Sequence, residues 1–514
     1  MERFLYAQKL DKHPKINVWF AFPAIENFAM ASLGYLSIFK LLDLNDDIFV
    51  ERVYADSKTT RCPVEDVDVI GFSTSFEIDI LTVVKMLKKY DIPLRASGRG
   101  ENHPFIFAGG PAVNSNPLPY QEFYDFISIG EGQFTLKVLD FIANNKHLKR
   151  DEILEKIKDF EGIWVPKFGK YDVKVVRDEL LEPVSTPILS DKSFFKDTFV
   201  IEIERGCPKM CNFCLASWLN LPARFLDTQK IINSIDNALK YTNKIALLGA
   251  YVAGHPDFDK IIDFIAQKNE ISPIELSISS LRADLADEKL FKTLVKCAQK
   301  HATIAIEAGS ERMRKIIRKD LTDEQIFKTV ECARLSGLKG LKIYTMIGFP
   351  NETQSDIDAL VELAKDLKNK NKGFELTFSL STLIPKAHTP FEDILKENSK
   401  SLEKKIEYLK KQMHKIGITL RPSSVDWDDV QAILSRCDIS LADYIIEVCE
   451  RGGNLGAFKH VWREFYKQGI FRADLHESAI MPYDNKNAQL PWSFIKAAPQ
   501  DLLESRKKEY LSLV

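Results

Sequence analysis

Three cysteines, Cys207, Cys211 and Cys214, stand close together in the sequence with the spacing C-x3-C-x2-C. Cysteine thiolates hold the irons of iron–sulfur clusters, and an electron-carrying cubane cluster ordinarily uses four of them. Three thiolates from one loop leave the fourth iron without a protein ligand. A small molecule can then bind that iron, much as one binds the open position of a catalytic zinc ion. The spacing therefore predicts a 4Fe-4S cluster with one open iron.

Two other kinds of metal site fit these cysteines less well. A structural zinc site takes four Cys or His ligands, usually in two pairs, and the sequence has no second pair and no histidine near the loop. An iron–sulfur electron carrier or sensor, the non-enzymatic alternative, needs a fourth cysteine, for which Cys62 before Pro63 is the candidate. The remaining cysteines stand singly in amphipathic helical stretches, where a free cysteine acts as a small apolar side chain. They are Cys297, Cys332, Cys437 and Cys449.

The cysteines belong to the loop RGCPKMCNFC (residues 205–214), which resembles the signature of the radical SAM superfamily. The resemblance implies an enzyme whose open iron binds the amino and carboxylate groups of S-adenosylmethionine. An electron from the cluster then cleaves S-adenosylmethionine to a 5′-deoxyadenosyl radical, which acts on a substrate that the sequence does not identify. The resemblance also implies an electron donor such as flavodoxin or ferredoxin. Arg205 and Lys209 are expected to favour the thiolate form of the cysteines.

The cluster loop follows the first of a series of expected β-strands, and each of these strands ends in polar residues or glycine. Strands that alternate with helices favour a parallel sheet, and parallel barrels carry their sites at the carboxyl ends of the strands. We therefore predict a partial (β/α)6 barrel over residues 196–395, the architecture that the resemblance also implies. The expected strands cover residues 199–203, 245–248, 274–278, 303–306, 340–347 and 374–380.

Several residues at these strand ends are candidates for binding S-adenosylmethionine, in roles that the resemblance implies. Phe213 lies beside the adenine, and Ile347 and Gly348 belong to a glycine-containing strand end that packs on it. Gly249 and Ala250 stand where the superfamily has Gly-Gly-Glu, a region that contacts the methionine amino group. The sequence departs from Gly-Gly-Glu at this position.

Two charged residues complete the expected cofactor site. Arg282 is the candidate for the methionine carboxylate, because a guanidinium offers a bidentate fork. The alternative for Arg282 is a salt bridge to Asp284. Glu307 ends an apolar strand, where a buried carboxylate needs a partner. A ribose hydroxyl pair or the methionine ammonium would supply one, and so would Arg318 or Lys319.

Residues 1–145 alternate strands and helices, which predicts a doubly wound parallel sheet. Glycine turns follow two of the strands, where such sheets bind ligands. The pattern resembles the cobalamin-type N-terminal domain of B12-binding radical SAM proteins, so a cobalamin-dependent radical SAM methyltransferase is the alternative enzyme. The chain lacks the Asp-x-His-x-x-Gly motif of domains that bind cobalamin through histidine, which slightly favours loss of cobalamin over binding without that ligand. The expected strands cover residues 16–22, 49–54, 67–73, 105–108 and 126–129.

Two further stretches, residues 307–319 and 384–391, resemble a narrower group of radical SAM proteins with a degenerate cobalamin-like N-terminal domain. His388, in the second stretch, is the candidate catalytic residue, as a proton donor that faces the substrate. The equal alternative is that His388 caps a turn before Pro390.

The rest of the chain is expected to support these two domains, with a connector at residues 146–195 and a mostly helical cap at residues 396–514. The net charge of −2 gives no overall basicity for nucleic acid, although RNA is not excluded as a substrate. No apolar run approaches the ~18 residues of a membrane span. Eight cysteines, three of them clustered, are not a disulfide framework. We therefore expect a cytoplasmic protein.

Overall fold

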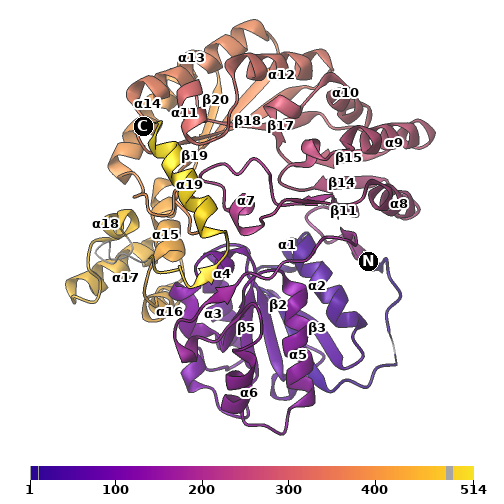
Figure 1. The fold of residues 1–514 in the computed structure, drawn as a ribbon, viewed down its shortest axis with the longest axis vertical. Coiled ribbons are helices and arrows are strands. Elements are labelled where there is room, and N and C mark those ends of the chain that lie inside the picture. The colour runs from indigo at the N-terminus through magenta and orange to yellow at the C-terminus, as the bar shows by residue number, and fades with distance from the viewer. Residues whose placement is uncertain (1, 10, 482–489, 514) are drawn as a thin grey trace. The chain divides into compact units, whose positions relative to one another are not determined.

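The computed structural model describes residues 2–9, 11–481 and 490–513 (Figure 1). The α/β class predicted from the sequence is confirmed. Contacts between residues divide the chain into two compact units, and the predicted division into four segments stays a prediction. The first unit contains Met1–Asp178, Thr186–Asp197 and Val430–Ala497, and the second contains Glu179–Ser185, Thr198–Asp429 and Ala498–Val514.

A six-stranded sheet, parallel except for its last strand, forms the centre of the first unit. Its strands are rich in buried aromatic and β-branched residues, as is typical of parallel sheets with both faces covered. All the strands predicted for the N-terminal domain are present. In spatial order the strands are β3 (Ile48–Tyr54), β2 (Ile16–Phe22), β4 (Val69–Ser73), β5 (Phe105–Gly109), β6 (Phe126–Ser128) and β7 (Ile163–Trp164).

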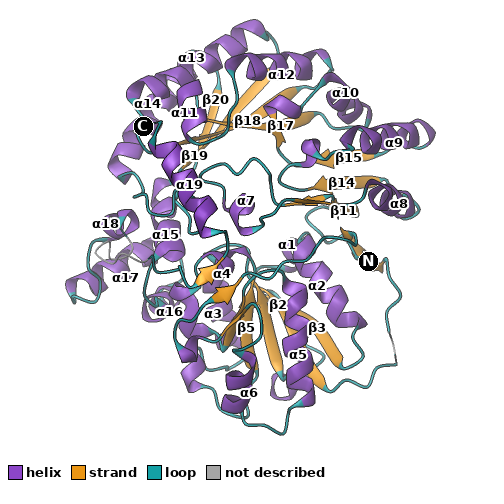
Figure 2. Ribbon diagram, in the orientation of Figure 1, coloured by secondary structure: helices purple, strands orange, loops and turns teal. Residues whose placement is uncertain are grey.

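Helices α2 (Leu33–Leu44) and α5 (Thr135–Asn144) lie on one face of this sheet (Figure 2). Their buried side chains, among them Phe39 and Leu139, form one apolar core with the sheet. The hydroxyl of Tyr35 in α2 donates to the Phe20 carbonyl at 2.8 Å, so this buried polar group is satisfied. Further helices of the unit are α1 (Glu26–Ala29), α3 (Asp79–Lys89), α4 (Pro111–Ser115), α6 (Arg150–Ile157), α16 (Ala442–Glu450), α17 (Leu455–Lys467) and α18 (Leu475–Ile480).

The parallel strands of the second unit form two sheets. The chain passes from one sheet to the other between β15 (Glu275–Ile278) and β16 (Leu281–Arg282). Helices lie on the outer side of the strands in Figure 1, and α7 (Leu215–Leu219) lies on the inner side. Next to β15 come β14 (Lys244–Leu248), β11 (Thr198–Glu202) and the antiparallel β9 (Val184–Ser185), and next to β16 come β17 (His301–Glu307), β18 (Gly340–Ile347), β19 (Glu375–Thr382) and β20 (Thr419–Pro422).

All the strands predicted for the barrel are present, and β20 is an addition in a region predicted to be helical. Helices α14 (Ser399–Lys415) and α16 lie in the segment predicted to be a mostly helical cap. No helix in the described part of the chain is long and apolar enough to span a membrane. Helices of the second unit include α8 (Thr228–Ala238), α9 (Phe258–Ile271), α10 (Glu288–Lys296), α11 (Glu311–Ile316), α12 (Asp323–Leu335), α13 (Gln354–Lys370), α14 (Ser399–Lys415) and α19 (Gln500–Leu511), and α15 (Val425–Arg436) leads into the first unit.

Candidate functional site

The cysteine loop follows β11 and the short strand β12 (Glu204–Arg205) in the second unit. Cys207 and Cys211 are buried, Cys214 is half-buried, and all three thiols are free of disulfides. The loop therefore presents three thiols at the carboxyl end of a parallel strand, the edge at which such folds carry their sites.

Asn212 anchors the middle of this loop. Its backbone N–H donates to the Ile317 carbonyl at 3.0 Å, and its side-chain amide donates to the Ile316 carbonyl at 2.8 Å. The indole N–H of Trp218 donates to the carbonyl of Cys211 at 3.0 Å. These bonds fix the backbone around the cysteines, which is the support that a preorganised binding site needs.

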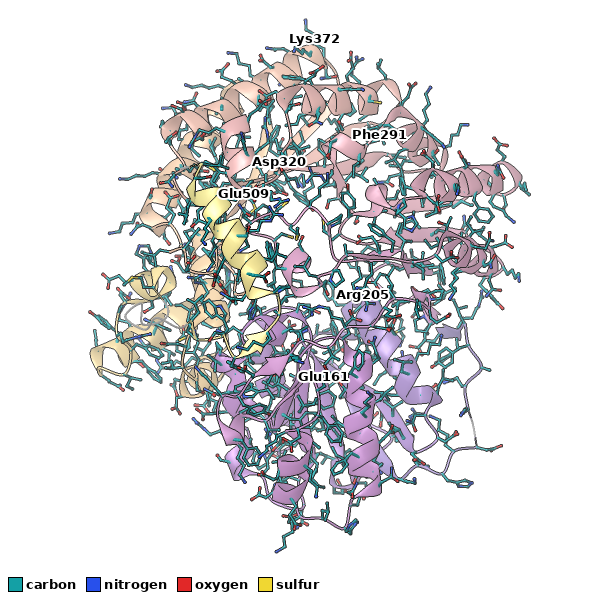
Figure 3. The ribbon with its side chains drawn as sticks, viewed as in Figure 1. Glu161, Arg205, Phe291, Asp320, Lys372 and Glu509 are labelled. Atoms are coloured by element: carbon teal, nitrogen blue, oxygen red, sulfur yellow. The ribbon has the colours of Figure 1, made fainter. Side chains whose placement is uncertain are left out.

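Burial favours the protonated form of the Cys207 and Cys211 thiols, because it raises the pKa of each. It raises the pKa of Cys211 to about 12, although the positive charges of Lys319 and Arg282 oppose the shift. Arg205, labelled in Figure 3, was expected to favour the thiolate form of the cysteines. Its guanidinium instead pairs with Glu202, with Nε 2.9 Å from Oε1. Binding of a cluster through thiolates must therefore release protons.

The three cysteines suit a cubane cluster better than a single metal ion. Among the described residues, no three His, Cys, Asp or Glu side chains are arranged to hold one ion. A cubane cluster takes each thiolate on a different iron, so its ligands need not converge on one point. Soft thiolates are also the donors that iron–sulfur clusters select. The cysteine loop thus fits the predicted cluster.

Arg282 lies at the end of β16 and is held on two sides. Its Nε is 2.9 Å from Oδ1 of Asp284, and Nη2 is 3.2 Å from Oδ2 of the same residue. Nη2 also donates to the Lys319 carbonyl at 2.7 Å. The salt bridge that the sequence left as the alternative is therefore present. Among the described contacts Nη1 makes no hydrogen bond, so two of the five guanidinium N–H groups remain for a ligand.

Glu307 ends β17 at an irregularity in the pairing with β18. The register shifts between Ala305 and Glu307, and Glu307 has a φ of 66°. Bulges of this kind re-aim a side chain. Its Oε1 accepts a hydrogen bond from Nζ of Lys319 at 2.9 Å, and both side chains are largely buried. Neutralisation by Lys319, one of the predicted alternatives, is therefore present.

Phe213 joins an apolar cluster of the second unit that includes Met346 and Phe349. The ring centroids of Phe213 and Phe349 are 6.2 Å apart. Ile347 is buried at the end of β18, and Gly348 follows it with a φ of 86°, a conformation that favours glycine. Phe213 of the cysteine loop therefore packs near the end of β18 through Phe349, and its place beside the adenine stays a prediction.

The turn of Gly249 and Ala250 after β14 covers a carboxylate that the sequence analysis missed. Glu204 is 1% exposed, and its Oε1 accepts the backbone N–H of Tyr251. A Cβ on Gly249 would lie 2.2 Å from that oxygen, so only glycine permits the approach. Burial raises the pKa of Glu204 to about 7. In the sequence, Glu202 and Glu204 alternate with apolar residues, which places both carboxylates on one face of the strand. This alternation was the signal that could have identified Glu204 as a candidate.

The two remaining candidates, His388 and Cys62, lie in different units. His388 is buried with a φ of 62°, and its backbone N–H donates to Oε2 of Glu392 at 3.0 Å. Its role stays a prediction. Cys62 has its thiol 3.6 Å from the Pro63 carbonyl and its backbone N–H 2.9 Å from Oε2 of Glu51. Burial raises the pKa of Cys62 to about 11.

Two family models match the chain. The model described as radical SAM proteins, N-terminal, matches residues 34–166, and the model of the radical SAM superfamily matches residues 201–364. An uncharacterised protein of Methanocaldococcus jannaschii is 31% identical over 388 residues, which cover 74% of this chain and 80% of that protein. An uncharacterised methyltransferase of Pyrococcus horikoshii is 26% identical over 327 residues, which cover 59% of this chain and 65%, just under two thirds, of that protein.

A solved structure shares the fold. It is the radical S-adenosylmethionine methyltransferase TsrM from Kitasatospora setae, determined with cobalamin and a 4Fe-4S cluster bound. The TM-score is 0.51 at 13% sequence identity, and the likeness covers 73% of this chain and 76% of TsrM. The cysteine loop on its parallel strands, the two family models and the relative from Methanocaldococcus lead to one conclusion: the chain belongs to the radical SAM superfamily of enzymes.

Proposed function

We propose that this enzyme binds a 4Fe-4S cluster through Cys207, Cys211 and Cys214 and uses it to cleave S-adenosylmethionine reductively. The observation that carries the proposal is the single loop of three thiols, held next to the charges of Arg282 and Lys319 that act on Cys211. When bound, the cluster supplies one electron that breaks a carbon–sulfur bond, which gives methionine and a 5′-deoxyadenosyl radical that takes a hydrogen atom from the substrate. An external reductant of the flavodoxin or ferredoxin class supplies that electron.

The chain's own residues would bind and orient S-adenosylmethionine. Arg282 would take the methionine carboxylate with the N–H groups of Nη1, while Asp284 holds the rest of the guanidinium in place. Glu307 would accept hydrogen bonds from the ribose hydroxyls beside its ion pair with Lys319.

Other contacts to the cofactor would come from apolar surface and backbone. Phe213, Ile347 and Gly348 would enclose the adenine, which is flat and largely apolar on its faces. The backbone of Gly249 and Ala250 would contact the methionine amino group at the end of β14. His388 would serve as a proton donor on the substrate side.

The products of the reaction test this proposal directly. The protein is reconstituted anaerobically with iron and sulfide, reduced with dithionite and incubated with S-adenosylmethionine, and the nucleosides are identified by mass spectrometry. We expect slow formation of 5′-deoxyadenosine in the absence of substrate. A fully loaded cluster that yields no 5′-deoxyadenosine would overturn the proposal.

A cavity in the first unit favours one second candidate, a cobalamin-dependent methyltransferase. The cavity has a volume of about 280 Å³, and its lining includes the residues at the carboxyl ends of β4, β5 and β6. Its lining is mainly apolar, and the glycine turns predicted to be ligand sites form part of it. The methyltransferase named among the relatives supports this candidate, and the missing histidine motif weakens it. The lining includes Phe20, Tyr35, Phe72, Phe107, Gly110 and Gly130.

The second candidate function is tested by whether the protein retains cobalamin. Protein incubated with hydroxocobalamin is passed through a desalting column, and the bound corrin is read from its visible absorption. A methyltransferase would retain cobalamin and form S-adenosylhomocysteine only in its presence. Ile38→Trp, which fills the cavity, would then lower the retained amount. Equal retention of cobalamin by Ile38→Trp and the wild type would show that this cavity does not bind it.

A further inference from the structure

Glu204 is a buried carboxylate with one oxygen that lacks a partner. The side chain projects from β12 under the turn of Gly249, and Oε1 accepts the N–H of Tyr251. Oε2 is fully buried and has no hydrogen-bond partner in the described part of the chain. A buried acceptor of this kind costs free energy unless a donor reaches it.

The other charged side chains around the cysteine loop are paired. Glu202 pairs with Arg205, and Glu307 pairs with Lys319. Arg282 is held by Asp284 in the same way. Glu204 has no ion pair with any described residue. The unsatisfied oxygen therefore calls for a donor from outside the chain.

The surroundings of Glu204 select the chemistry of that donor. The turn above the carboxylate is fixed, since the Ser279 hydroxyl donates to the Gly249 carbonyl at 3.1 Å. The Gly249 carbonyl and the Glu204 carboxylate are both acceptors at this turn. An alkylammonium group has three N–H donors and a positive charge, so it would satisfy both the carboxylate and a neighbouring carbonyl. A sulfonium carries the same charge but has no N–H to donate.

We propose that Oε2 of Glu204 binds the α-ammonium group of the methionine moiety of S-adenosylmethionine. The assignment rests on the proposed function and deepens it, because it supplies a carboxylate at a turn whose own residues, Gly249 and Ala250, have none. Glu204 is a binding residue in this account, and Glu307 is left to the ribose.

The test compares two ligands on two variants that carry the same chemical change. Reconstituted Glu204→Gln and Glu307→Gln are each titrated by equilibrium dialysis with S-adenosylmethionine and with the analogue that lacks the α-amino group. We expect Glu204→Gln to weaken binding of S-adenosylmethionine by about tenfold to hundredfold and to leave the analogue unaffected. Glu307→Gln is expected to weaken both ligands by the same factor. Equal effects of Glu204→Gln on both ligands, or no effect, would overturn the assignment.

A second variant, Gly249→Ala, alters the residue that packs against the Glu204 carboxylate. The Cβ of Gly249→Ala would lie 2.2 Å from Oε1 of Glu204 and must displace it. The same selective loss of affinity is expected, at an iron content equal to that of the wild type. If wild-type protein forms 5′-deoxyadenosine but neither variant discriminates between the ligands, the role of Glu204 is wrong and the proposed function stands. If wild-type protein binds neither ligand, the proposed function itself fails.

Discussion

Nζ of Lys319 lies 2.9 Å from Oε1 of Glu307, and both side chains are largely buried. The pair joins the end of β17 to the segment after α11, and its two charges both act on the pKa of Cys211. Removing only one member of such a pair lowers the free energy of unfolding, because the remaining charge stays buried without a partner.

Removal of Lys319 alone is therefore expected to destabilise the second unit. Lys319→Met should lower the free energy of unfolding by about 3–5 kcal/mol, as measured by chemical denaturation. The double variant Lys319→Met/Glu307→Gln should recover most of that loss, since no unpaired charge remains. Lys372→Met, at an exposed lysine labelled in Figure 3, is the matched control. Additive effects of the two single changes would contradict a direct Lys319–Glu307 interaction.

Arg282→Lys is expected to weaken binding of S-adenosylmethionine by about tenfold. A lysine ammonium cannot replace the contacts of the guanidinium to Asp284 and the Lys319 carbonyl and still offer two N–H groups to a carboxylate. Equilibrium dialysis on reconstituted protein measures the change. Arg334→Lys, on α12 next to Asn371, is the control and should bind as the wild type does.

Gly348→Ala is expected to cost stability and cofactor affinity together. Gly348 has a φ of 86°, and a Cβ there would lie 3.0 Å from Leu402. Forcing alanine into this conformation should lower the free energy of unfolding by about 1–2 kcal/mol. Gly34→Ala, in α2 with open space around the new Cβ, is the control and should be neutral or stabilising. A neutral Gly348→Ala would show that the turn can relax.

The sequence predicted the strands well, because long apolar runs bounded by glycine or proline are a local signal. β2 has the predicted bounds, Ile16–Phe22. β20 was missed because it is only four residues long and ends in a proline, and because its pairing with β19 is a tertiary contact. The cysteine triplet was also a local signal, whereas the surroundings of Glu204 were not. The Glu204 carboxylate contacts the backbone of Tyr251, which is distant in sequence, so spacing alone could not reveal this contact.

The stability of the first unit is expected to depend on pH through the carboxyl group of Asp79. Burial raises its pKa from the usual 3.8 to about 6, although Ser75 and Phe76 donate backbone N–H groups to the carboxylate. The folded state therefore holds this proton more tightly than the unfolded state, so the contribution to stability is full below pH 4 and is lost as pH rises through 6. Relative to Asp79→Asn, the wild type should lose about 2 kcal/mol between pH 4 and 7. Chemical denaturation of both proteins across this range measures the difference, and parallel pH profiles would contradict it.

The most direct test of the account is reductive cleavage of S-adenosylmethionine by matched cysteine variants. Cys211→Ala removes a proposed cluster ligand, and Cys332→Ala removes a free cysteine of α12 in the same unit. After anaerobic reconstitution and reduction, we predict 5′-deoxyadenosine from the wild type and Cys332→Ala and none from Cys211→Ala. Cleavage that persists at the wild-type rate in Cys211→Ala would contradict the assignment of the cluster to this loop.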